Sequence, residues 1–213
     1  MTDRALKLLQ KVERKTSIRD ENKIKAILER NNVSYSEAII EFQVRYGGLV
    51  FHAGLEPICW GIHHVTPRGE FKYMGKEIVP FEDEGEFPEF SLLCADTLYQ
   101  MRWTIDKNGA IFEDFDILTN SFDKMIEDYA MWDEFKVHKD KEVWKRNIYG
   151  KDLNLILSRF NKVEPLEEIQ EPGIRWFKVD NNYYLTERNK EIVVFGPTHI
   201  ETNQRGSILA LVS

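Results

Sequence analysis

The stretch that decides the fold is residues 98–115, which read Leu98-Tyr-Gln-Met-Arg-Trp-Thr-Ile-Asp-Lys-Asn-Gly-Ala-Ile-Phe-Glu-Asp-Phe115. Aromatic and β-branched residues, which favour strands, lie on both sides of Asp106-Lys-Asn-Gly109. The Asn-Gly pair supplies the residues with positive φ that a tight hairpin turn requires. The stretch therefore predicts an antiparallel hairpin in the middle of the chain.

Other short runs have the same composition and are bounded by Gly, Pro or acidic residues, which is typical of strands. Before the hairpin these runs are residues 49–52, 58–62, 71–74 and 90–94. After it, we expect a second hairpin from residues 174–179 and 183–186, and closing strands at 192–195 and 208–212. Strands are thus expected in two groups, one central and one C-terminal.

Helical patterns precede and separate these groups. Apolar side chains recur at helical spacing in the first 46 residues, from Phe122 to about Lys139, and in residues 153–160. Ser34-Tyr-Ser-Glu37 has the form of a capping box, in which a serine and a glutamate satisfy the first free amides of a helix. Gly47-Gly48 is expected to end that helix, because glycine accepts the left-handed conformation found there.

The order of these elements indicates an α+β fold, with N-terminal helices, a central antiparallel sheet, further helices and a C-terminal group of strands. The charged residues 136–150 are expected to be a connection. We therefore predict a first α+β domain at residues 1–137 and an α+β extension at 138–213 that packs on it.

Charge is distributed unevenly along the chain. Residues 1–30 carry a net charge of +4, residues 31–135 carry −13 and residues 136–213 carry +2, which together give −7. A negative field repels phosphate backbones and attracts basic partners. The middle of the chain therefore argues against nucleic-acid binding and favours a basic protein partner. An acidic surface that only keeps the protein soluble is the alternative interpretation.

The densest acidic segment is Glu82-Asp-Glu-Gly-Glu-Phe-Pro-Glu89, which lies between two expected strands. It is either a solvated loop or a docking loop for a basic protein, in which aromatic side chains supply contact area and the charges speed encounter. Trp60 and Trp103 would be its anchors if they are exposed. The expected binding residues are Glu82, Asp83, Glu84, Glu86, Glu89, Asp114 and Asp116, together with these two tryptophans.

No phosphate-binding glycine loop, nucleophile elbow or zinc-type cysteine pairing is present in the sequence. One group of residues has the types that bind metals, namely His52, Cys59, His63 and His64. Adjacent histidines on a strand point to opposite faces, so His63 and His64 are not expected to share a metal. We expect neither a bound metal nor a cofactor.

Two weaker patterns leave catalysis open. Asp114 and Asp116 would share one face of a strand, where they could hold a divalent cation for chemistry on a small or sugar substrate. Cys94, close to Asp96, could be a thiol nucleophile, but an activated thiol needs a basic neighbourhood that this acidic third of the chain does not supply.

The two cysteines and the chain terminus bear on the compartment. Cys59 and Cys94 both lie in apolar runs and are expected to be buried free thiols. The N-terminal residues lack the apolar core of a signal peptide, and no stretch approaches the roughly 18 apolar residues of a membrane span. The sequence therefore predicts a cytoplasmic protein without a membrane partner.

Three segments form a further pattern, namely Phe42-x-x-x-Tyr46-Gly47-Gly48, the hairpin Met101-Arg-Trp-Thr-Ile-Asp106-Lys-Asn-Gly-Ala-Ile111, and Asn120-Ser-Phe-Asp123. Together they resemble the SUKH superfamily, which includes fungal cell-wall assembly regulators and bacterial immunity proteins. The resemblance covers about residues 17–137. It implies a non-enzymatic fold that binds and neutralises a toxin, often a nuclease or a deaminase.

Three functions are carried forward. The first is an intracellular, non-enzymatic immunity protein that neutralises a toxin, such as a cationic nuclease. The second is a metal-dependent enzyme that uses Asp114 and Asp116. The third is a regulator or subunit without a toxin partner, in which Trp144, Trp176 and the C-terminal strands form an oligomer surface.

Overall fold

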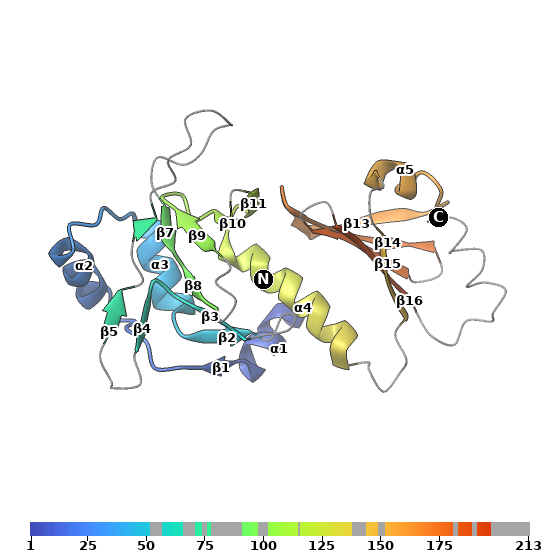
Figure 1. Ribbon diagram of the computed structural model, residues 1–213. Helices are drawn as coiled ribbons and strands as arrows, with labels where there is room; N and C mark the ends of the chain where they lie inside the picture. The colour runs from blue at the N-terminus through green and yellow to red at the C-terminus, as the bar shows by residue number, and fades with distance from the viewer. Residues whose placement is uncertain are drawn as a thin grey trace, which may run out of the picture.

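The predicted α+β class is confirmed, with helices in the N-terminal half and antiparallel sheets in the middle and at the C-terminal end. The long helix α4 (Phe122–Val137) lies between two groups of strands (Figure 1). The computed structural model describes residues 1–51, 57–65, 71–73, 76–77, 91–97, 102–114, 116–137, 144–148, 152–180, 183–188 and 191–196.

Three capped helices open the chain: α1 (Asp3–Lys11), α2 (Glu21–Arg30) and α3 (Glu37–Tyr46). The side chains of Thr2, Asp20 and Ser36 accept hydrogen bonds from the first turn of these helices. The predicted capping box at Ser34 is wrong, because Ser36 is the residue with the extended backbone of an N-cap, at φ −125° and ψ 166°.

The two glycines after α3, Gly47 and Gly48, differ in backbone conformation, and neither position has space for a Cβ. Gly47 has an ordinary φ of −52°, and a Cβ at this position would clash with Gln43. Gly48 has the left-handed conformation, with φ at +85°, and a Cβ there would meet the carbonyl oxygen of Lys15. The expected left-handed residue is therefore Gly48, and both glycines are also required by close packing.

Substituting Gly48 with alanine is expected to destabilise the fold more than the same change at Gly109. Both positions have positive φ, which costs about 1–2 kcal/mol for an L-residue. Only Gly48 adds a backbone clash, because a Cβ on Gly109 would lie 3.4 Å from the Cβ of Ala38. Urea unfolding of the two variants tests this difference, and an equal loss of stability would contradict it.

The central strands form two sheets and a separate ribbon. The first sheet has the order β1 (Glu13–Arg14), β2 (Leu49–Phe51), β3 (Ile58–Trp60) and β8 (Ala95–Asp96). The second has the order β11 (Asp116–Thr119), β10 (Ile111–Glu113), β9 (Trp103–Asp106), β7 (Ser91–Leu93) and β6 (Lys76–Glu77). The ribbon pairs β4 (His63–Val65) with β5 (Phe71–Tyr73). The central hairpin predicted around the turn at residues 106–109 is confirmed, since β9 pairs with β10 through Ile105 and Ile111.

The C-terminal sheet is larger than expected. Its order is β12 (Trp144–Ile148), β16 (Glu191–Gly196), β15 (Tyr183–Arg188), β14 (Ile174–Val179) and β13 (Val163–Gln170). The predicted second hairpin is confirmed as β14 and β15. The predicted connection at 136–150 is wrong in part, because β12 pairs with β16 along its whole length. The predicted helix at 153–160 ends early, as α5 (Leu153–Leu157), and the predicted strand at 208–212 lies outside the described residues.

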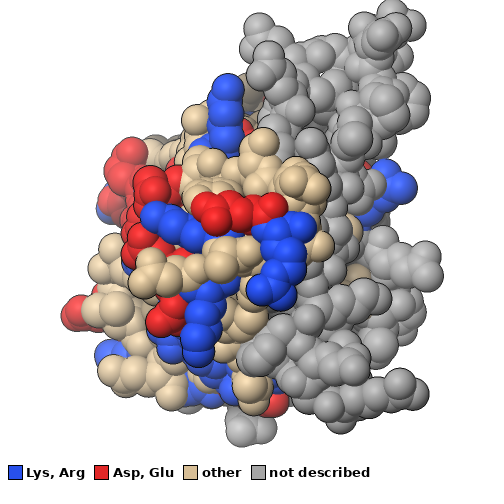
Figure 2. Space-filling model, turned by 90° about the vertical axis from the view of Figure 1, so that its left-hand side faces the viewer, with Lys and Arg blue, Asp and Glu red and all other residues tan. Residues whose placement is uncertain are grey.

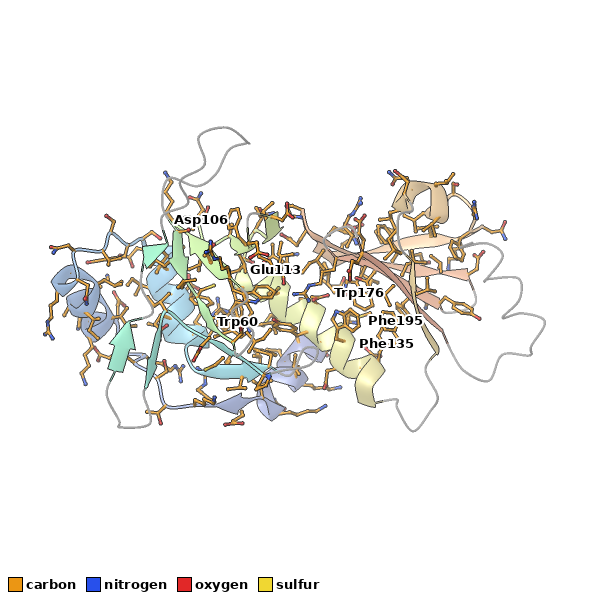
Figure 3. All side chains as sticks on the ribbon, in the orientation of Figure 1. Trp60, Asp106, Glu113, Phe135, Trp176 and Phe195 are labelled. Carbon is orange, nitrogen blue, oxygen red and sulfur yellow. The ribbon has the colours of Figure 1, made fainter. Side chains whose placement is uncertain are left out.

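The C-terminal sheet packs against α4 through aromatic side chains. The Phe135 ring stacks on Phe195 at 4.4 Å and on Trp176 at 5.8 Å between ring centroids (Figure 3). These rings belong to a hydrophobic core that continues into the N-terminal helices and central strands. A second cluster lies between α5 and the C-terminal sheet. The predicted boundary near residue 137 is therefore crossed by one continuous core.

Among the described residues, no helix combines the length and the apolar character that crossing a membrane would require.

Candidate functional site

The two tryptophans that were expected to anchor a partner are in the core. Trp60 and Trp103 are each 1% exposed, and their rings meet edge to face at 5.2 Å. Trp60 also packs against Phe122 at the start of α4, 4.7 Å between centroids. Both are therefore corrected to core residues, because the Trp60 side chain of the first sheet and the Trp103 side chain of the second sheet pack against each other. Trp176, expected at an oligomer surface, is likewise fully buried.

Two of the three motif segments that carry the resemblance, the end of α3 and the start of α4, pack against each other. Phe122 packs against Phe42 at 5.1 Å and against Tyr46 at 4.8 Å. The hydroxyl of Tyr46 donates to the carboxylate of Asp123, which also accepts from the Arg45 guanidinium at 3.0 Å. Burial and the bond to Asp123 raise the pKa of Tyr46. These contacts join α3 to α4, so the side chains of Phe42, Tyr46, Phe122 and Asp123 have structural roles.

The described residues that flank the acidic segment in the sequence lie at one end of the second sheet. The acids of that segment, Glu82, Asp83, Glu84, Glu86 and Glu89, lie outside the described residues. The strands on either side of it are paired, with Glu77 opposite Ser91 and Ser91 opposite Asp106. The chain therefore leaves and re-enters the sheet at neighbouring positions, next to the turn of the β9–β10 hairpin.

That turn is held by its own aspartate. Asp106, which is 7% exposed, accepts hydrogen bonds from the backbone N–H groups of Asn108 and Ala110, both at 2.8 Å. Gly109 lies against Ala38 in the first turn of α3, and the neighbouring Glu37 side chain is 81% exposed. We call the ends of β6 and β7, the 106–109 turn and the start of α3 the loop-bearing end of the sheet (Figure 3).

Asp114 and Asp116 lie at the opposite end of the same strands. Asp114 is in the turn between β10 and β11 with a left-handed φ of 52°, and β11 begins at Asp116. The expected strand alternation therefore does not apply to this pair, although both side chains are exposed. Three residue steps along β9, about 10 Å, separate this end from the loop-bearing end. Two ends of one short sheet can still contribute to one protein interface.

No three His, Cys, Asp or Glu side chains in the described part of the chain are grouped so that they could hold a metal ion. His52 lies outside the described residues, and His63 and His64 are neighbours on β4. Cys59 and Cys94 are both free thiols, as expected, with Cys94 buried and Cys59 half-buried. Burial raises the pKa of both thiols, which is the opposite of what an activated nucleophile needs.

The most deeply buried charge joins α4 to the C-terminal sheet. The Asp128 carboxylate is fully buried and accepts hydrogen bonds from Trp176 Nε1 at 2.7 Å and from the Arg188 guanidinium at 2.9 Å. Arg188 also lies over the Trp103 ring, 5.5 Å from its centroid. Burial raises the pKa of Asp128, and the charge of Arg188 opposes that shift. No sequence motif pointed to this pair, because its members are 60 residues apart.

Part of the charge asymmetry along the sequence is compensated by ion pairs between segments. The basic N-terminal residues pair with acids of the middle segment, as in Arg4 with Glu127 and Glu134, and Lys11 with Asp133. Basic and acidic side chains also intermingle on the face that carries α2 and α3 (Figure 2). The excess of acid in residues 31–135 therefore overstates the negative field at the described surface.

Comparison with protein-family models, with curated proteins and with solved structures finds no match to this chain.

Proposed function

We propose that this protein binds a basic protein partner through the loop-bearing end of its second sheet, and that it neutralises a toxin in the way the SUKH resemblance implies. The observation that carries the proposal is the attachment of the acidic segment. Five acids of the sequence fall between Glu77 and Ser91, and these two flanking residues pair with each other at one end of the second sheet. Loops held in this way on a regular scaffold are common binding elements.

Three further features support binding at this end. The neighbouring turn is fixed by hydrogen bonds to Asp106, so the loop-bearing end is pre-organised. Glu37 extends the acidic character onto α3, and Lys25 pairs with it at 3.1 Å. The described carboxylates that are most buried have structural partners instead, as Glu127 has in Thr2 and Asp128 has in Arg188.

The proposal predicts that a toxin domain is encoded beside the gene for this chain, and that domain is the partner used in the test. Reversing the charges of Glu82, Glu84 and Glu86 to lysine is expected to weaken toxin binding at least 100-fold at low salt, because like charges then face each other. Isothermal titration calorimetry measures the affinity. Rescue of growth when toxin and variant are expressed together measures neutralisation.

A matched triple reversal of three exposed acids, Glu164 and Glu167 on β13 and Glu191 on β16, is the control. It changes the net charge in the same direction but lies on the C-terminal sheet, so binding is expected to change less than threefold. Equal losses for both variants would show that net charge alone matters. Unchanged affinity for the toxin after reversal of Glu82, Glu84 and Glu86 would contradict the proposal that the partner binds at the loop-bearing end.

A further inference from the structure

The basic helix α1 sits on an acidic face of α4. The backbone N–H and the hydroxyl of Thr2 donate to the two carboxylate oxygens of Glu127, both at 2.6 Å. Arg4 lies within 4.0 Å of Glu127 and 3.9 Å of Glu134, and it donates to Glu168 on β13 at 2.9 Å. One arginine thus faces three carboxylates, so the face beneath α1 keeps an excess of negative charge.

The apolar contacts of α1 follow one side of the helix. Ala5 and Leu8 are buried in the main hydrophobic core and Leu9 and Val12 pack against it, while Leu6 is 45% exposed. At the far end of the helix, Lys11 reaches Asp133 at 3.5 Å, and both side chains are partly exposed. Helices of nine residues are not stable alone in water, so α1 depends on this face for its structure.

The link between α1 and the rest of the chain is short and exposed. Only β1 (Glu13–Arg14) pairs with β2, and residues 15–20 form no regular element. The chain is anchored from Arg14 onward, because the Arg14 guanidinium donates to the carbonyls of Gly47 at 2.9 Å and Arg45 at 3.0 Å, and the buried Ile18 carbonyl accepts from Gln43 at 2.8 Å. Residues 1–12 are therefore connected to the core strands through the short strand β1, and α1 packs chiefly on α4.

We propose that residues 1–12 are a detachable strap, which occupies in cis a docking face for a basic amphipathic helix. The face comprises Glu127, Asp133 and Glu134 of α4 together with Glu168 of β13. Its occupant is a helix of α1 chemistry, with small or aliphatic side chains on one side and Arg or Lys at both ends. Such a helix lies along an apolar groove rimmed by acids. The assignment of this helix to the basic partner rests on the proposed function, whereas the strap itself does not.

The test uses the full chain and a fluorescent peptide of residues 1–19. Replacing Leu8 with Asp places a charge in the contact and releases the strap, while the face on α4 keeps all its residues. The peptide is expected to bind this variant at least tenfold more tightly than it binds the wild-type chain, measured by fluorescence anisotropy. High salt should weaken that binding, because the rim contacts are charged.

The matched control is Leu6→Asp, on the exposed side of the same helix, which should behave as the wild type does. A peptide that itself carries Leu8→Asp should not bind. Equal binding of the peptide to the wild type, the Leu8→Asp chain and the Leu6→Asp chain would contradict the strap proposal. Binding of the peptide that carries Leu8→Asp would contradict it as well.

If the Leu8→Asp chain does not fold, hydrogen exchange of the wild-type chain tests whether α1 is released from α4. Amides of α1 are expected to exchange at least tenfold faster than those of α4, through local release. Equal protection of the two helices would overturn the proposal. Neither measurement involves the toxin. A strap that passes both tests is therefore supported even if the toxin does not bind. A strap that fails them while the toxin binds contradicts the strap proposal and leaves the proposed function standing.

Discussion

Replacing Asp128 with alanine is expected to lower the free energy of unfolding by about 3 kcal/mol, one of the two largest effects of any single change considered. Breaking a buried ion pair by removing one partner costs roughly 3–5 kcal/mol, because the other charge is left without compensation. Arg188 keeps 22% of its side-chain surface exposed and retains the Trp103 ring, which places the loss at the lower end. The Trp176 indole also loses its acceptor.

Urea unfolding followed by tryptophan fluorescence measures the loss, and two variants separate its causes. Asp128→Asn keeps an oxygen for Trp176 but removes the charge that faces Arg188, so it is expected to lose less than alanine does. Asp133→Ala, on the same helix, breaks a pair with Lys11 in which both partners are partly exposed, and should change stability by no more than about 0.5 kcal/mol. If Asp128→Ala lowers the free energy of unfolding by as little as Asp133→Ala does, the buried pair of Asp128 with Arg188 makes no net contribution to stability.

The elements that could be predicted are those whose chemistry is local. The turn Asp106-Lys-Asn-Gly109 carries its own side-chain acceptor and its own positive-φ residue, so the hairpin follows from four adjacent residues. The same is true of the Asp20 cap, which needs only the first turn of α2. Agreement between local preference and global structure makes such elements readable from one sequence.

The elements that were missed depend on partners far along the chain. β13 includes Pro165 and several acids, and it forms an edge strand whose register shifts between Pro165 and Gln170. The Gln170 side chain donates to the carbonyls of Leu166 and Trp176, which stabilises this irregular stretch. Neither alternation nor composition signals a strand of this kind. β12 is similar, because its pairing with β16 joins residues nearly fifty positions apart.

The same reason limits prediction of the site. Segment charges locate the acids of the middle segment but not the ion pairs of Asp128 with Arg188 or of Glu127 with Arg4. Exposure of the tryptophans depends on which face of a strand meets α4, and that is decided by tertiary packing. The loop-bearing end became identifiable only through the register of β6, β7 and β9.

Replacing Trp60 with alanine is expected to lower the free energy of unfolding by about 3–5 kcal/mol, the usual range for removing a buried aromatic side chain. Trp60 is 1% exposed and contacts the rings of Trp103, Phe122 and Tyr129. Its removal would leave a cavity where β3 and β9 meet α4, and those rings cannot all move to fill it because each packs in the same core.

The comparison of Trp60→Ala with Trp60→Phe distinguishes packing from polar contacts. Trp60 Nε1 is buried without a hydrogen-bond partner among the described residues, so phenylalanine removes an unsatisfied donor and loses only part of the ring volume. We expect Trp60→Phe to lose less than about 1.5 kcal/mol. Leu155→Ala, at a 55% exposed position on α5, is the control and should change stability by no more than about 0.5 kcal/mol. Thermal and urea unfolding measure all three variants. If Trp60→Ala unfolds like the wild type but loses affinity for the toxin, Trp60 is an interface residue and its place in the core is wrong.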